Sequence, residues 1–148
     1  MQATGHRAAA RQAYEKALAL DSRAAYALNN LCYLSFLEGE HTQALERCRA
    51  ALRIDPGFVA AHNNLALVYA SAGCLDCARL EFALAGDAAV TQYNLGIVYL
   101  AERNHEKAAS AFDAAAAGSP ELLGHAARAL ARQARTLSTQ SRDAKEHR

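Results

Sequence analysis

The chain has 148 residues, of which 37 are alanine and 2 are proline, and its 16 basic residues almost balance its 15 acidic ones. This length suits one domain, and the alanine content favours helices over a β-sheet. A net charge of +1 gives no general attraction to nucleic acid or to an anionic membrane, so we expect neither as a partner.

The first part of the chain predicts a helix over residues 6–20 that lacks a partner helix before it. Ala10 and Ala17 recur as Ala44 and Ala51 at the same offset (44−10 and 51−17 are both 34), so the segment matches the second helix of a pair. Two interpretations follow: a native unpaired helix, or a fragment of a longer protein. Because the apolar residues of such a helix need cover, a second copy of the chain is one candidate to supply it, which would make a homo-oligomer.

Three pairs of helices are predicted next, over residues 24–54, 58–86 and 89–118. Leu31 recurs as Leu65 (65−31 is 34), and Leu65 recurs as Leu95 at a shorter offset (95−65 is 30). A period of about 34 residues with helical patterning is typical of a helix–turn–helix solenoid. The difference between the two offsets is close to one helical turn. We therefore expect the second helix of the middle pair to end early, at Gly86.

The end of the chain predicts one more helix and a polar tail. Ser119 and Pro120 suit the N-cap and the first position of a helix, which we expect to cover residues 120–136 and to cap the repeats. Its inner face is expected to carry Leu122, Leu123 and Leu130. Residues 137–148 are polar and are expected to be disordered. Residues 1–136 would then form a single domain.

The repeated small and large residues resemble the tetratricopeptide repeat family. Each second helix carries a small residue where the two helices cross and a larger one a turn later. The matching residues of the last pair are Leu95, Gly96, Tyr99, Ala108, Phe112, Ala115 and Pro120. The first pair departs from the pattern, with Cys32 and Ser35 where the family has Gly and Tyr. The resemblance implies an all-α fold, namely a right-handed α-solenoid of three hairpins, preceded by one unpaired helix and closed by a capping helix.

The resemblance also implies that the first helix of each pair lines a concave face. An asparagine stands directly before the packed leucine in every pair, and an amide both donates and accepts, which suits a peptide backbone. The competing interpretation is that these amides only bond the neighbouring helix. Arg128, on the predicted capping helix, either binds an acidic group of the partner or belongs to a solvated face. The predicted peptide contacts are Tyr26, Asn29, Asn30, Tyr33, Asn63, Asn64, Leu67, Tyr93, Asn94, Ile97 and Arg128.

The four cysteines are too few to indicate a disulfide framework. Cys32 and Cys48 fall at the helix crossing of the first pair, where we expect buried thiols. Cys74 and Cys77 form a CxxC motif at the start of a helix, but structural zinc needs four ligands and no second such pair exists. We therefore expect Cys74 and Cys77 to be small packing residues, with a thiol or metal switch as a remote alternative.

The sequence contains no pattern typical of a catalytic site, a phosphate loop or a metal site, so we expect no enzyme activity, cofactor or metal. It has neither an apolar run of about 20 residues nor a signal-peptide core, which predicts a cytoplasmic protein. The leading hypothesis is a non-catalytic module that binds a protein or peptide partner in its groove. The alternatives are a self-assembling scaffold, or an adaptor like the secretion chaperones and pilus assembly factors that use such repeats.

Overall fold

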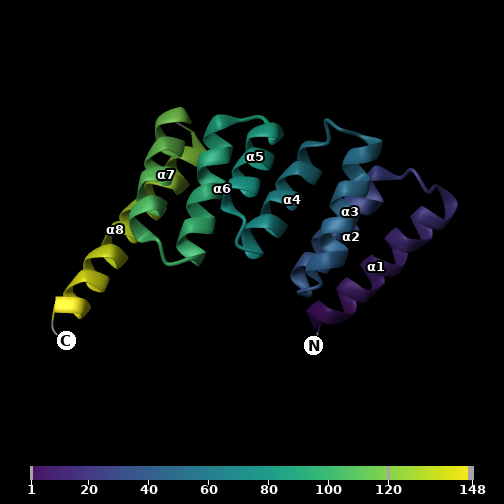
Figure 1. Cartoon of the computed structure of the whole chain (residues 1–148), viewed down its shortest axis with the longest axis horizontal. Coiled ribbons are helices and arrows are strands. Elements are labelled where there is room, and N and C mark those ends of the chain that lie inside the picture. Colours follow the sequence, from purple (N-terminus) through teal and green to yellow (C-terminus); the bar gives the residue numbers. More distant parts are fainter. Residues whose placement is uncertain (1, 120, 147–148) are drawn as a thin grey trace. The chain divides into compact units, whose positions relative to one another are not determined.

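The computed structural model describes residues 2–119 and 121–146. These residues form eight α-helices and no strand, so the predicted all-α class is confirmed (Figure 1). The helices are α1 (Gln2–Leu20), α2 (Ala25–Leu37), α3 (His41–Ile54), α4 (Val59–Ser71), α5 (Leu75–Ala85), α6 (Ala88–Ala101), α7 (His105–Gly118) and α8 (Leu122–Glu146). Within these residues, no helix combines the length and the apolar character that a membrane crossing requires.

The helices fall into two compact units, Met1–Ala85 and Gly86–Arg148, and each is described by itself. The single domain expected over residues 1–136 therefore stays a prediction. In the first unit, α1 packs on α2, α2 pairs with α3, α4 pairs with α5, and α4 contacts both α2 and α3. In the second unit, α6 pairs with α7, and α8 packs on α7 and α6.

The turns inside the first two pairs depend on glycine. Gly39 and Gly73 follow α2 and α4, and both have positive φ angles, of 76° and 84°. Side chains other than glycine rarely tolerate this left-handed conformation, which is common just after a helix. The recurrence of glycine at the same position of the repeat therefore marks the place where the first helix of each pair stops.

Small residues form the contact between the helices of each pair. Ala44, Ala78 and Ala108 are fully buried at equivalent positions of α3, α5 and α7. In the second unit, Phe112 lies in a core of alanines from α7 and α8. A Cβ atom added to Gly96 would lie 2.5 Å from the Phe112 ring, so the ring packs directly on the bare backbone of α6. Helices that meet through small side chains approach closely and leave room for such a ring.

The middle pair has a short second helix, as predicted from the reduced offset between Leu65 and Leu95. Helix α5 has 11 residues, whereas α3 and α7 have 14 each. Gly86 follows α5 with a φ of 116°, and Asp87 then caps α6 by accepting a hydrogen bond from the Val90 N–H at 3.0 Å. Gly86 and Asp87 alone thus separate the end of one helix from the start of the next.

The predicted disordered tail is wrong for residues 137–146, because α8 continues to Glu146. In these late turns, Arg142 pairs with Glu106 of α7 at the surface. The inner face of α8 also differs from the prediction, since Leu122 is 84% exposed. Leu130 does pack on the core of the second unit, as predicted, beside the buried small residues Gly124, Ala127, Ala131 and Ala134. Pro120 and residues 147–148 lie outside the described residues, so the predictions for them are not assessed.

Candidate functional site

The asparagines of α2 and α4 bond each other across the helix contact. The Asn64 Nδ2 atom donates to the Asn29 Oδ1 atom at 2.8 Å, and Asn29 is only 6% exposed. For this pair, the interpretation as a bond between neighbouring helices holds. Asn29 is unsuited to contact a peptide because it lies in the interior, so its inclusion among the contacts was wrong. Asn63 is half-buried on α4.

Helix α2 presents a row of large apolar side chains to solvent. Tyr26 is 56% exposed, Tyr33 is 42% exposed and Leu37 is 39% exposed. Their spacing of i, i+7 and i+11 places them on one side of the helix, and the half-buried Asn30 lies among them at i+4. We call these four residues the α2 face. Leu67 of α4, at the repeat position equivalent to Tyr33, is half-buried.

The residues predicted on α6 divide between surface and core. Ile97 is exposed, and Asn94 is half-buried. Tyr93 is half-buried and packs edge-on against Phe112 with ring centroids 5.7 Å apart, so part of its ring contributes to the core of the second unit. Arg128 is half-buried on α8. Val90, seven residues before Ile97 on α6, is also exposed.

A network of polar side chains surrounds the C-terminal end of α2. Arg47 of α3 donates to the buried Ser35 Oγ atom at 2.5 Å, and this hydroxyl donates to Glu40 at 3.1 Å. Arg11 of α1 donates to Glu40 at 3.1 Å and also pairs with Glu38. Partial burial acts to lower the pKa of Arg11, but its hydrogen bonds and attraction to the two carboxylates outweigh this and raise it. The network therefore joins α1, α2 and α3.

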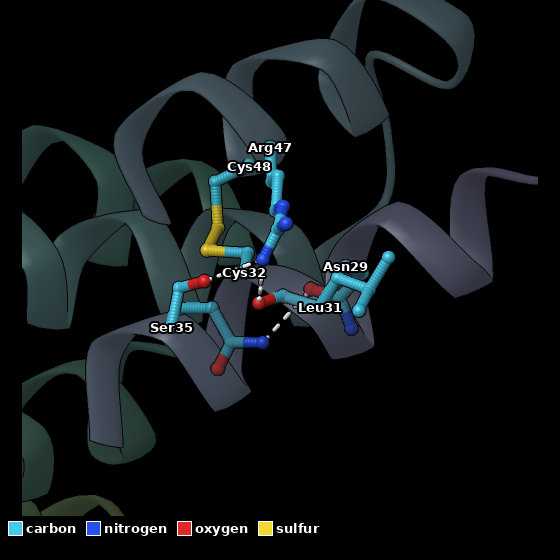
Figure 2. Close-up of a disulfide and its surroundings, with 7 residues drawn as sticks. Asn29, Leu31, Cys32, Ser35, Arg47 and Cys48 are labelled. Atoms are coloured by element: carbon cyan, nitrogen blue, oxygen red, sulfur yellow. Dashed lines mark hydrogen bonds between the residues drawn. A yellow bond between two sulfur atoms is a disulfide. The ribbon is translucent and has the colours of Figure 1, made fainter. Parts of the chain in front are cut away.

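The four cysteines form two disulfide bonds, which contradicts the expectation of free thiols. Cys32 of α2 bonds Cys48 of α3, and both residues are 0% exposed (Figure 2). Their Cα atoms lie 5.3 Å apart, within the range that a disulfide requires. Cys74 and Cys77, expected to be packing residues, also bond each other. The predicted position at the helix crossing was correct for Cys32 and Cys48, and the predicted chemistry was wrong.

The same place in the three pairs is filled in three ways. Cys32 and Cys48 correspond to Ala66 and Phe82 in the middle pair (66−32, 82−48) and to Gly96 and Phe112 in the last (96−66, 112−82). Both phenylalanines are almost completely buried. A disulfide therefore occupies the two positions at which the other pairs have a small residue and a buried phenylalanine.

A buried histidine joins α4, α5 and the turn before them. The His62 Nδ1 atom lies 2.7 Å from the Glu81 Oε2 atom, and its Nε2 atom lies 2.9 Å from the Pro56 carbonyl oxygen. A carbonyl can only accept, so Nε2 carries a proton and donates it. The contact between Nδ1 and Glu81 connects α4 to α5.

Glu81→Ala should lower the free energy of unfolding by about 1–3 kcal/mol, because it leaves the buried His62 ring nitrogen without its partner. Glu81→Gln should cost less, since an amide can still donate to that nitrogen. Urea unfolding followed by circular dichroism measures both variants. Glu15→Ala, at an exposed position of α1, is the control and should change stability by less than about 0.5 kcal/mol. Equal effects of Glu81→Ala and Glu15→Ala would contradict this role of the contact between His62 and Glu81.

The groove between α7 and α8 is polar. Arg135 pairs with Asp113 at 2.7 Å, and both side chains are about half exposed. Exposed pairs of this kind contribute little to stability. Among the residues that the structure describes, no three metal-ligating side chains cluster. This groove shows no arrangement suited to a particular ligand.

Comparison with known proteins adds no relative, since no protein-family model and no curated protein matches the chain. Of the predicted contacts, the first unit brings Tyr26, Asn30 and Tyr33 together on one side of α2. Leu37 was not among the predicted contacts, although its i+11 spacing from Tyr26 was a signal for it.

Proposed function

We propose that this chain is a non-catalytic protein–protein interaction module of the tetratricopeptide type, and that its α2 face binds an extended peptide or a partner segment. The observation that carries the proposal is the joint exposure of Tyr26, Tyr33 and Leu37 along one side of a helix. Large apolar side chains gathered on a surface are typical of interaction sites. Three successive helical pairs with equivalent buried alanines support the assignment to this type of repeat.

The chemistry of the α2 face suits a peptide chain. Tyrosine supplies a large contact area with few rotatable bonds and a hydroxyl that can hydrogen-bond, which is why it is frequent among residues that dominate binding. The half-buried Asn30 carries an amide that can donate to and accept from a peptide group whatever the side chains of the ligand. The surface would therefore select an apolar segment with an accessible backbone.

The interior behind this surface favours binding without rearrangement. Cys32, directly before Tyr33 in the chain, is bonded to α3, and Ser35 is held by Arg47. These bonds fix the helix from which the tyrosines project. A surface that is already ordered loses little conformational entropy when a ligand binds, which increases affinity for a given contact area.

Tyr33→Ala should weaken peptide binding at least about 30-fold, as expected for a residue that contributes about 2 kcal/mol or more to an interface. The ligand for this test is a peptide selected on the full chain from a random displayed library, and calorimetry measures the affinity. Leu80→Ala removes an exposed apolar side chain from α5 of the same unit and should leave binding unchanged.

Circular dichroism must show the same helix content for both variants as for the parent chain. If Tyr33→Ala and Leu80→Ala lower the affinity of the selected peptides equally, the peptides do not bind on the α2 face. Failure to select any peptide of micromolar affinity would also contradict the proposal.

A further inference from the structure

The disulfide between Cys74 and Cys77 differs in placement from the one between Cys32 and Cys48. Its cysteines are three residues apart at the start of α5, and both are half-buried. The bond between Cys32 and Cys48 joins two helices and is fully buried. The Cys74–Cys77 bond links no other helix to α5, so opening it removes no connection between elements of the fold.

The same two positions form a hydrogen-bonded helix cap in the last pair. Cys74 is the N-cap of α5, since its carbonyl oxygen accepts from the Ala78 N–H at 3.0 Å. The equivalent N-cap of α7 is Asn104 (104−74 is 30), whose side chain accepts from the Lys107 N–H at 3.3 Å. Lys107 is the equivalent of Cys77 (107−77 is 30). The disulfide therefore joins the two positions that a side-chain cap normally connects.

This equivalence indicates what happens when the bond opens. The first N–H groups of α5 lack helical acceptors, and the positive end of the helix dipole lies there. A thiolate at Cys74 can accept from the Cys77 N–H as the Asn104 side chain accepts from Lys107. Helix N-termini stabilise thiolates in this way and thereby make a disulfide there easier to reduce. The open form is thus stabilised by the fold itself.

We propose that Cys74 and Cys77 form a thiol–disulfide exchange site that oxidises a dithiol of a partner protein. This activity is independent of peptide binding on the α2 face. It requires only the half-exposed bond and the N-terminus of α5.

The exchange proceeds in two balanced steps. A thiolate of the partner forms a bond to one sulfur of the Cys74–Cys77 disulfide, and the other sulfur leaves as a thiolate at the helix N-terminus. The second thiol of the partner, after losing its proton, attacks the mixed disulfide and releases the chain. The partner gains one disulfide and loses two electrons, and Cys74 and Cys77 gain those electrons and two protons.

The test uses the oxidised full chain and, as the probe, a synthetic peptide with two cysteines in its reduced form. Samples are alkylated at intervals, and mass spectrometry identifies the alkylated cysteines. We expect one peptide disulfide per chain, alkylation of Cys74 and Cys77, and an intact bond between Cys32 and Cys48. We also expect the peptide to react at least about tenfold faster with the chain than with glutathione disulfide, because the leaving thiolate is stabilised.

Cys74→Ser/Cys77→Ser is the control variant, and it should keep its helix content because serine is a good N-cap residue. It should not oxidise the peptide. The proposal is overturned if this variant oxidises the peptide as fast as the parent chain, or if Cys32 and Cys48 are the cysteines that react. It is also overturned if the Cys74–Cys77 bond reacts no faster than glutathione disulfide.

Discussion

Phe112→Ala should lower the free energy of unfolding by about 3–5 kcal/mol, the usual cost of removing a buried aromatic ring. The ring is completely buried, and it contacts alanines of two helices and the bare backbone of Gly96. Urea unfolding measures the loss. Hydrogen exchange by mass spectrometry should show faster exchange in α6, α7 and α8 than in the helices of the first unit.

Gly96, on which the Phe112 ring packs, provides a second test of this contact. Gly96→Ala places a methyl group 2.5 to 2.8 Å from three atoms of the Phe112 ring, so the ring must move. We expect a net loss of about 1–2 kcal/mol, since crowding of a packed core outweighs the better helix propensity of alanine. Gly5→Ala has open space in α1 and is the matched control, with no loss expected.

A double-mutant cycle distinguishes crowding from a general effect of the alanine. When Phe112 is replaced by leucine, the added methyl group at position 96 has more room. Gly96→Ala should therefore cost less in the Phe112→Leu background than in the parent chain. The same cost in both backgrounds would contradict the contact between these two residues.

Cys32→Ala/Cys48→Ala should lower the free energy of unfolding by about 3 kcal/mol, the stabilisation expected of a disulfide that closes a loop of this size. The two cysteines are 16 residues apart and hold α2 against α3. Urea unfolding in the presence and absence of a reductant measures the effect. The parent chain should lose stability when reduced, and the variant should lose much less, since only the short loop closed by Cys74 and Cys77 is then opened.

The middle pair suggests how the loss can be recovered. Cys32→Ala/Cys48→Phe copies the combination of Ala66 and Phe82, in which a buried ring packs at the same crossing. This variant should be more stable than Cys32→Ala/Cys48→Ala, because the ring fills the space that the sulfur atoms occupied. A variant less stable than the double alanine would show that the first pair is too narrow for the ring.

The repeat pattern predicted the helices and turns closely, because it depends on local features. Glycines after α2 and α4, alanines at the crossings and the missing turn in α5 are all visible as positions in the sequence. The predicted pairs over residues 24–54, 58–86 and 89–118 begin and end almost where the observed helices do. Local chemistry and helical periodicity were sufficient for this part of the fold.

The direction of individual side chains was harder to predict. Asn29 and Asn30 are neighbours, and one residue corresponds to a rotation of about 100° around the helix. One of the two amides is therefore buried against Asn64, while the other lies on the α2 face. Tyr93 illustrates the same limit, since the sequence does not show that its ring packs edge-on against Phe112.

Long-range bonds were not visible in the sequence at all. The polar residues after Leu137 predicted a disordered tail, but α8 continues through them. Arg142 in this segment pairs with Glu106 of α7, which lies 36 residues earlier in the chain. The cysteine pairing depends likewise on the distance between helices, which composition does not give.

The complete burial of Cys32 and Cys48 has a consequence for how the protein is made. Oxidants dissolved in water cannot reach either sulfur once α2 has closed on α3. The disulfide between Cys32 and Cys48 must therefore form before or while α2 packs on α3, when both thiols are still exposed to solvent. Protein produced in a reducing host should keep Cys32 and Cys48 reduced after purification in air. Refolding under oxidising conditions should be needed to form the disulfide.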